Sequence, residues 1–167
     1  LKFTAPITGI VGPNGSGKSN IAEAFRFVLG EQSIKSLRGK KGEDMIWNGG
    51  GDGPSGSGRA NRASVKLIFD NRSKLFPSLD FDEVSLERVV NRDNSNEYLL
   101  NGSQVRLKDI MELLAAAHIG STGHQIISQG EADRILAASI SERRLMIEDA
   151  LGLKIYQWKK LESIRKL

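Results

Sequence analysis

The chain has 167 residues, with 24 Lys and Arg against 20 Asp and Glu, and contains no cysteine. That length fits one domain with a hydrophobic core, and 39% hydrophobic with 26% charged residues is typical of a soluble globular chain. The lack of cysteine excludes disulfides, thiolate metal sites and a cysteine nucleophile, and it is compatible with a cytoplasmic protein. No apolar run approaches the roughly 18 residues of a membrane span, so we expect no membrane partner.

The net charge of +4 is distributed unevenly along the chain. Residues 1–34 carry three basic and two acidic residues, whereas residues 35–74 carry nine and four. Residues 75–153 carry seven basic and thirteen acidic residues, and residues 154–167 carry five and one. The two basic blocks are candidate nucleic-acid surfaces, although solvated surface charge is the more common explanation of such blocks.

Two strands and a helix are predicted at the start of the chain. Leu1–Thr4 has a strand-like pattern, and Ile7–Val11 is predicted as a short buried strand because a proline and a glycine bound it. Ser19–Leu29 places its apolar residues at helical spacing, and Gly30 marks the C-terminal stop of this helix.

A small antiparallel sheet is predicted in the middle of the chain. It follows residues 48–58, a glycine-rich stretch typical of either a native flexible loop or an engineered linker. Ser64–Asp70, Val84–Val90 and Glu97–Leu100 have strand patterns, and Asn101-Gly102 is a tight-turn signal.

Helical patterns follow the predicted sheet. They cover Leu107–Ala117, Glu131–Ala138 and the chain from Ser141 onwards. Ser141 followed by Glu142 fits the start of a helix, because a serine can cap the first turn and an acidic residue favours it. Helices combined with strands indicate the α/β fold class.

The sharpest motif lies between the second predicted strand and the first predicted helix. It matches the phosphate-binding pattern G-x-x-x-x-G-K-[ST] in full, as Gly12-Pro13-Asn14-Gly15-Ser16-Gly17-Lys18-Ser19. Glycines let the backbone approach phosphates, and N–H groups at a helix start point at an anion. We expect Lys18 to reach the β- and γ-phosphates and Ser19 to offer its hydroxyl to Mg²⁺. The alternative is a glycine-rich turn without a ligand, which the flanking strand and helix disfavour.

A hydrolytic site also needs an acidic metal partner on a neighbouring strand. One candidate is Asp70, which follows Leu67-Ile68-Phe69. Lys66 interrupts that run, however, and the alternation indicates a half-exposed hairpin strand rather than a buried central one. We therefore expect the chain by itself to lack a complete hydrolytic site.

At this point the sequence resembles a known family, the N-terminal head segment of SMC (structural maintenance of chromosomes) ATPases, especially bacterial ones. The resemblance rests on the blocks Gly12–Asn20, Phe25–Ser33, Lys35–Gly39, Ile126–Glu131, Glu142–Arg144 and Glu148–Gly152. The order and separation of these blocks also match the family, and together they cover most of the chain.

The resemblance implies a P-loop NTPase fold of the ATP-binding-cassette head type. This chain would supply the N-terminal half of the head at residues 1–152, with a mixed sheet, antiparallel hairpins and helices. Residues 153–167 would begin the coiled-coil neck. In the family, the signature motif, the acidic metal-binding strand and the switch histidine lie in the C-terminal half, which would explain the missing acidic strand and place Asp70 in the head hairpin.

The resemblance also implies ATP and Mg²⁺ as cofactors and assigns site residues. The nucleotide-binding residues would be Pro13, Asn14, Gly15, Ser16, Gly17, Lys18, Ser19 and Asn20. Lys18, Arg38 and Gln129 would serve catalysis, with Ser19 and Gln129 as Mg²⁺ ligands. An amide oxygen can bind Mg²⁺ without adding charge, and a guanidinium suits an arginine-finger role in phosphoryl transfer. Taken alone, Gln129 would be read as a capping or surface residue, and Arg38 as a surface arginine.

The partners implied are the C-terminal half of the same head, a second head in an ATP-dependent homodimer, a kleisin subunit at the neck, and double-stranded DNA. Apolar residues in the tail form a broad helical stripe, at Leu151, Ile155, Trp158, Leu161 and Ile164. That stripe fits either the entry into a coiled coil or a terminal helix that packs on its own domain.

The function implied is ATP-driven DNA organisation in chromosome condensation and segregation, at the nucleoid in the cytoplasm. An SMC-like DNA-repair ATPase of the RecN type is the main alternative. A small P-loop kinase and a non-catalytic scaffold that binds a partner through its tail are others.

Three features depart from the family pattern. The family has a further strand and a short basic–aromatic segment before Leu1, so we expect this chain to be a fragment of a longer protein. The glycine-rich loop at 48–58 is longer and less basic than the family's, and Leu151 stands where the family usually has alanine.

Overall fold

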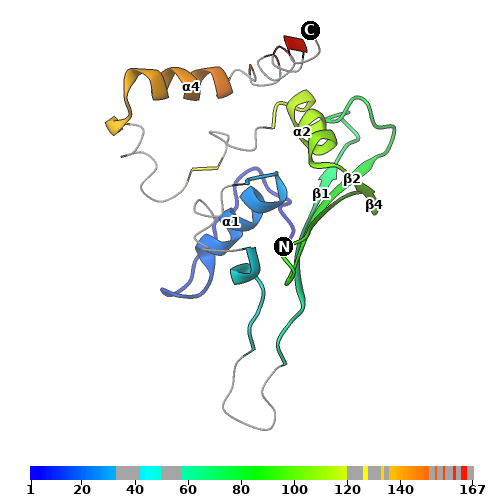
Figure 1. The fold of residues 1–167 in the computed structure, drawn as a ribbon, viewed down its shortest axis with the longest axis vertical. Helices are drawn as coiled ribbons and strands as arrows, with labels where there is room; N and C mark the ends of the chain where they lie inside the picture. Colours follow the sequence, from blue (N-terminus) through cyan, green and yellow to red (C-terminus); the bar gives the residue numbers. More distant parts are fainter. Residues whose placement is uncertain are drawn as a thin grey trace.

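The computed structural model describes residues 1–32, 42–49, 58–119, 126–127, 133, 136–150, 153, 156, 160 and 163–164. Two helices lie against an antiparallel sheet in this part of the chain, and a further helix lies apart from them (Figure 1). No helix in the described ranges is both long and apolar enough to cross a membrane.

The first helix, α1, spans Lys18–Val28, close to the predicted bounds. The C-terminal end of this helix packs in the protein interior, since Phe27, Val28 and the following residue Leu29 are all buried. Gly30 follows with φ 97°, and the Glu31 amide donates to the Arg26 carbonyl at 3.1 Å. A left-handed glycine with this hydrogen bond is a common helix ending, so the predicted stop is confirmed.

The sheet has four antiparallel strands in sequence order: β1 (Arg62–Asp70), β2 (Glu83–Asn91), β3 (Asn96–Leu100) and β4 (Ser103–Val105). Three of these strands were predicted, each one to two residues shorter, whereas the three-residue β4 is too short to leave a pattern. Asn101 and Gly102 join β3 to β4 with φ of 49° and 83°. Two successive positive φ values match the right-handed twist of a hairpin, which confirms the predicted turn.

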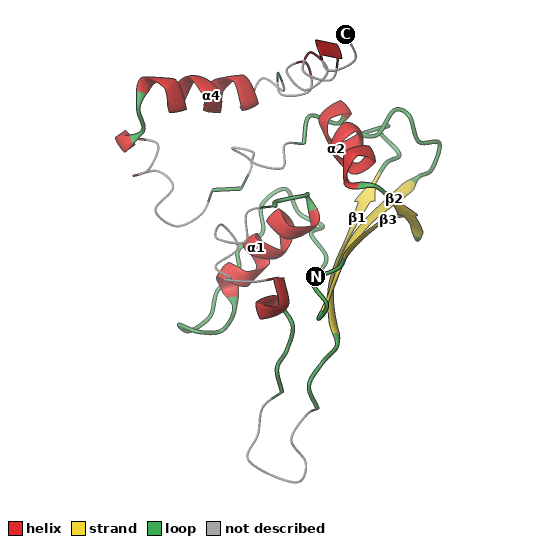
Figure 2. Ribbon diagram, in the orientation of Figure 1, coloured by secondary structure: helices red, strands yellow, loops and turns green. Residues whose placement is uncertain are grey.

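The core lies between one face of this sheet and the two helices α1 and α2 (Figure 2). The second helix, α2, spans Leu107–Ala116 and confirms the predicted helix. Strand β1 alternates strictly between exposed and half-buried residues, as expected of a strand with one wet face. The buried residues of the main cluster are Val28, Leu29, Phe76, Val84, Leu86, Tyr98, Ile110, Leu113, Leu114 and Ala117.

A fully buried asparagine organises the connection between β1 and β2. The Asn71 side-chain amide donates to the carbonyls of Leu79 (3.1 Å) and Phe81 (2.8 Å), and its carbonyl oxygen accepts the Phe76 amide at 2.7 Å. These bonds hold Phe76 in the core, where its ring packs edge-on against Phe69 at 5.3 Å between centroids.

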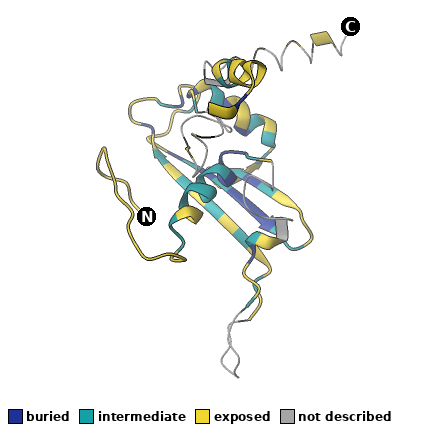
Figure 3. Ribbon diagram, turned by 90° about the vertical axis from the view of Figure 1, so that its left-hand side faces the viewer, coloured by how far each residue is buried: buried dark blue, intermediate teal, exposed yellow. Residues whose placement is uncertain are grey.

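The two strands predicted at the start of the chain do not form. Leu1–Thr4 and Ile7–Val11 have no strand pairing, and Ile7 and Val11 are 89% and 94% exposed. The segment runs clear of the sheet and is exposed along its length (Figure 3). A buried strand needs hydrogen-bonded neighbours, and all four strands of the described sheet come from residues 62–105. The segment is apolar as predicted, but the described residues provide no neighbouring strand for it.

The helix α4 spans Ile140–Ala150, so it begins one residue before the predicted start at Ser141. The cap is Ser139, whose hydroxyl accepts the Glu142 amide at 3.3 Å while the Glu142 carboxylate accepts the Ser139 amide at 2.8 Å. This reciprocal pair is a capping box, and the predicted cap, Ser141, lies two residues after the actual one. Half of the predicted helix at 131–138 and most of the tail at 153–167 lie outside the described residues.

Candidate functional site

The P-loop curls at the start of α1, and two of its glycines make the curl possible. Gly15 and Gly17 have φ of 82° and 86°, in the left-handed region that other residues avoid. A Cβ at Gly12 would lie 2.8 Å from the Ser16 hydroxyl, so the loop also closes tightly on itself. The positive φ of Gly17 explains why the motif requires glycine at that position.

The start of α1 fits an anion. Its N-cap, Gly17, offers no side-chain cap, and the first turn contains no acidic residue. The backbone N–H groups of that turn therefore keep their positive end toward the loop, without a carboxylate of the turn competing for them. This arrangement suits a phosphate group.

The Lys18 ammonium lies over the loop. It donates hydrogen bonds to the carbonyls of Gly12 (2.8 Å) and Pro13 (2.6 Å), the first two residues of the motif. Because an ammonium has three N–H donors, it can bind a phosphate oxygen without giving up both carbonyl bonds. Its position therefore agrees with the predicted phosphate contact.

Ser19 and Asn20 are exposed on the first turn of α1, next to Lys18. No group of three or more His, Asp or Glu that could hold a metal occurs in the described ranges. Mg²⁺ in nucleotide sites takes few protein ligands and completes its shell with phosphate oxygens and water. A single hydroxyl such as that of Ser19 fits this kind of site.

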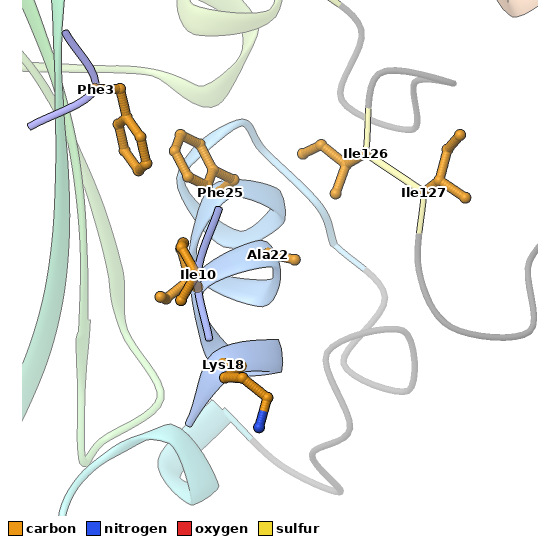
Figure 4. Close-up of a pocket in the computed structure, with 8 residues that line it drawn as sticks. Phe3, Ile10, Lys18, Ala22, Phe25, Ile126 and Ile127 are labelled. Atoms are coloured by element: carbon orange, nitrogen blue, oxygen red, sulfur yellow. The ribbon is translucent and has the colours of Figure 1, made fainter. Parts of the chain in front are cut away.

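A pocket of about 430 Å³ adjoins Lys18. Figure 4 shows Lys18, Ala22 and Phe25 along α1, with the Ile126 side chain pointing toward the helix from a neighbouring segment. Phe3 packs on Phe25 at 5.8 Å between ring centroids. The pocket lining is otherwise apolar and consists of Phe3, Ile10, Ile21, Ala22, Phe25, Ile126 and Ile127.

The predicted catalytic residues Arg38 and Gln129 lie outside the described residues. The described chain comes close to both in sequence, ending at Gln32 before Arg38 and at Ile127 before Gln129. The structure thus brings Lys18 and Ser19 together and places the segment that leads to Gln129 on the same pocket.

Two arginines that the sequence did not single out join distant parts of this site. Arg26 of α1 donates to the Ile126 carbonyl at 2.9 Å. Arg88 of β2 is buried between the rings of Phe27 and Tyr98, at 4.3 and 5.0 Å from their centroids. Burial lowers the pKa of the Arg88 guanidinium from its ordinary value. In the sequence, a single arginine within a helix or strand pattern gives no indication of such contacts.

Arg88 holds the end of α1 against the sheet. Its guanidinium donates to the carbonyls of Phe27 (2.8 Å) and Glu31 (2.7 Å). The Gln32 side chain donates to the Tyr98 hydroxyl at 3.0 Å, which fixes the next residue on β3. The chain after α1 is therefore held on the antiparallel sheet as far as Gln32.

Asp70 lies at the exposed end of β1 and pairs with Arg72. The hydrogen bonds from Arg72 lower the pKa of Asp70 to about 2. This placement confirms that the residue belongs to a half-exposed hairpin strand, as the alternation indicated, and it takes no part in the P-loop.

Within the basic block 35–74, the two flanks of the glycine-rich loop lie side by side (Figure 1). The Ala60 amide donates to the Trp47 carbonyl at 3.0 Å, and Arg92 donates to the carbonyls of both residues, at 2.7 and 2.9 Å. A short helical turn, η2 (Gly42–Met45), leads into the first flank, and Ile46 is buried. The block's described cations, Arg59, Arg62, Lys66, Arg72 and Lys74, are all exposed.

Sequence comparisons agree with the predicted family. A family model described as the RecF/RecN/SMC N-terminal domain matches residues 1–140. The chain is 45% identical over all 167 residues to the chromosome partition protein Smc of Mycobacterium leprae, and 44% identical to that of Bacillus subtilis. It spans about 14% of the length of these curated relatives. The family model also covers RecN, but these relatives are Smc proteins, which favours SMC over the RecN-type alternative.

Comparison with solved structures indicates the same family. A structure from work on the ATP-driven dimerization and DNA-stimulated activation of SMC ATPases has a TM-score of 0.79 at 39% identity, covering 89% of this chain and 87% of its own. An Smc head bound to the C-terminal domain of ScpA, from Pyrococcus furiosus, has a TM-score of 0.75 at 37% identity, covering 92% of this chain and 37% of its own. The chain therefore belongs to the SMC family, as an N-terminal head segment of an SMC ATPase.

Proposed function

We propose that the chain binds ATP and Mg²⁺ at its P-loop and contributes this site to an SMC head. The observation that carries the proposal is the start of α1, where left-handed Gly15 and Gly17 curl the loop beneath the Lys18 ammonium. Lys18 binds the β- and γ-phosphates, and Ser19 binds Mg²⁺. The nucleotide-contacting residues extend along the loop from Pro13 to Asn20.

Two residues outside the described part complete this chain's share of catalysis. Gln129 binds Mg²⁺ and responds to the γ-phosphate, and Arg38 stabilises the charge of the transition state. The support is the family membership together with the fixed approaches to both residues, through Gln32 and through Ile126.

The chain acts with the C-terminal half of the same head. Residues 1–152 form the N-terminal half and residues 153–167 begin the neck. The support is apolar surface that a lone domain rarely exposes. It includes the strand-like segment at the start of the chain and apolar residues of α4, with Leu1, Ile7, Val11, Ile140, Leu145 and Ile147 all more than half exposed.

The whole protein pairs two heads around ATP, binds a kleisin subunit at the neck, and organises double-stranded DNA at the nucleoid during chromosome condensation and segregation. The support comes from similar proteins, which are chromosome partition proteins and include Smc heads bound to ScpA. The exposed cations Arg59, Arg62 and Lys66 offer contacts for DNA phosphates in this chain.

The test of the nucleotide site uses a head reassembled from this chain and its C-terminal half. We expect saturable ATP binding and steady hydrolysis in the reassembled head, and loss of both in Lys18→Ala. Arg106→Met serves as the control, because Arg106 is exposed and pairs only locally with Asp109. Unchanged ATP affinity in Lys18→Ala would refute the site. Steady hydrolysis by this chain alone, abolished by Lys18→Ile, would refute the need for the other half.

The test of DNA contact measures the affinity of the reassembled head for long duplex DNA at two salt concentrations. Phosphate neutralisation releases counterions, so affinity should fall steeply between about 50 and 200 mM salt. The double variant Arg59→Gln, Arg62→Gln should bind more weakly and with a shallower salt slope. Binding that does not change with salt would contradict the proposal, and Arg38→Ala measured in parallel reports whether DNA stimulation of hydrolysis depends on that residue.

A further inference from the structure

Trp47 is an exposed aromatic residue on a firmly held stretch of main chain. It is 58% exposed, whereas the preceding residue, Ile46, is buried in a core cluster with Phe27. The Trp47 carbonyl accepts the Ala60 amide at 3.0 Å and the Arg92 guanidinium at 2.9 Å. A buried neighbour and two hydrogen bonds therefore fix the backbone from which the indole projects.

The faces of the Trp47 ring are open within the described part of the chain. No other ring and no cation of the described residues packs on the indole, and its N–H donates to none of their groups. A single exposed apolar side chain is common on protein surfaces and needs no explanation by itself. The charge of the surroundings therefore decides what this ring can bind.

Two exposed arginines lie close to the ring on the facing stretch of chain. Arg59 directly precedes Ala60, whose amide bonds to the Trp47 carbonyl, and Arg62 begins β1 two residues after Ala60. From the hydrogen-bonded pair and the spacing of successive residues, both arginine Cα atoms lie within about 13 Å of that of Trp47. Neither arginine forms an ion pair among the described residues, so both guanidinium groups can bind phosphates.

Phe81, in the connection between β1 and β2, provides a contrast. It is 56% exposed, much like Trp47, but its neighbours in sequence are Asp80 and Asp82. The nearby Lys74 is already paired with Asp80. Carboxylates beside a ring repel a phosphate backbone, whereas unpaired cations beside a ring attract it and leave the ring to stack on a base. Of these two exposed rings, Trp47 has the surroundings that suit nucleic acid.

We propose that Trp47, Arg59 and Arg62 form a contact site for single-stranded DNA. The indole stacks on an unpaired base, and the two guanidinium groups bind neighbouring phosphates. In a duplex each base face is covered by the next base pair, so an unpaired base suits the ring better. The site does not read sequence, because every base has a π-face. It rests on the DNA contact of Arg59 and Arg62 in the proposed function and adds base stacking to it.

The test compares oligothymidylate with duplex DNA of equal length on the reassembled head. Trp47→Leu keeps an apolar side chain but removes the aromatic face, so affinity for oligothymidylate should fall at least about fivefold, with duplex affinity within about twofold of the parent value. Trp47→Phe should retain part of the lost affinity, because it keeps a ring. Phe81→Leu is the matched control and should change neither affinity.

A second measurement needs no substitution. Ultraviolet cross-linking of the unsubstituted head to oligothymidylate that carries 5-iodouridine, mapped by mass spectrometry, should mark Trp47, because a base stacked on the indole is in direct contact with it. Cross-links confined to other residues would overturn the inference, even where Trp47→Leu lowers the melting temperature.

The remaining outcomes separate base stacking from the DNA contact on which it rests. If Trp47→Leu leaves oligothymidylate affinity unchanged, or weakens single-strand and duplex binding equally, the ring does not stack on unpaired bases. If duplex affinity still depends on Arg59 and Arg62 in that case, the DNA contact stands and base stacking alone is refuted. If the double variant Arg59→Gln, Arg62→Gln leaves both affinities unchanged, the DNA contact fails, and the single-strand site fails with it.

Discussion

Arg88 joins the end of the P-loop helix to the sheet. We expect Arg88→Met to lower the free energy of unfolding by about 3 kcal/mol, because it removes the guanidinium bonds to the Phe27 and Glu31 carbonyls, in buried and half-buried surroundings, together with two ring contacts. Urea unfolding followed by circular dichroism measures the change.

The control for Arg88 is Arg106→Met, which removes an arginine whose side chain is 82% exposed. Exposed ion pairs contribute little, so this change should cost less than about 1 kcal/mol. Equal losses in the two variants would show that the buried contacts of Arg88 contribute no more than an exposed ion pair.

Asp70 and Arg72 give a prediction about pH. The hydrogen bonds from Arg72 lower the pKa of Asp70 from 3.8 to about 2. Since the folded-state pKa lies below the unfolded one, the ionised carboxylate favours the folded state above about pH 4, and this contribution is lost as the pH falls toward 2. We expect an NMR titration of Asp70 to have its midpoint near 2, and Arg72→Ala to return it toward 3.8. The pKa of Asp80, which Lys74 lowers, should not respond to Arg72→Ala.

At the scale of elements, the connection between β1 and β2 depends on one side chain. Asn71→Ala removes three hydrogen bonds at a position with no exposed surface, so we expect a loss of about 3 kcal/mol in the free energy of unfolding. Asn71→Asp should not rescue it, because a carboxylate would face the Leu79 and Phe81 carbonyls where the amide now donates. Ser78→Ala, an exposed change in the same connection, should stay within about 0.5 kcal/mol. Equal stability of all three variants in urea unfolding would contradict the role of Asn71.

The sheet could be predicted from the sequence because its information is local. Each strand pairs with the next along the chain. Because one face of the sheet is exposed to solvent, apolar and polar residues alternate along the strands, and Asn101-Gly102 marks a turn. The helices α1 and α2 carry similar local signals in their apolar spacing and in Gly30. Confirmed elements therefore share one property, which is that their partners are close in sequence.

The features that the sequence did not predict correctly depend on partners that are distant in sequence. Ile7–Val11 has the composition of a buried strand, but a strand is buried by its neighbours, and the described chain supplies it with none. The contacts of Arg26 and Arg88 span 100 and about 60 residues, and no periodicity reports which carbonyl a distant guanidinium will reach. For the candidate site, the motif predicted the loop, Lys18 and Ser19, whereas the tethers that surround them required the fold.

At the scale of the whole molecule, the exposed start of the chain distinguishes packing within this chain from assembly with the other half. Ile7 is 89% exposed, so Ile7→Lys should leave the melting temperature of this chain unchanged within about 1 °C. If the segment is buried as a strand only when the C-terminal half joins it, a lysine there would face an apolar layer, and recovery of the co-expressed C-terminal half in a pull-down should fall at least tenfold. Ile68→Lys is the matched control, because Ile68 is 60% exposed on the outer face of β1 and should affect neither measurement. Undiminished recovery with Ile7→Lys would mean that the C-terminal half does not cover this segment. The docking surface would then have to lie elsewhere, with the exposed helix α4 as the next element to probe.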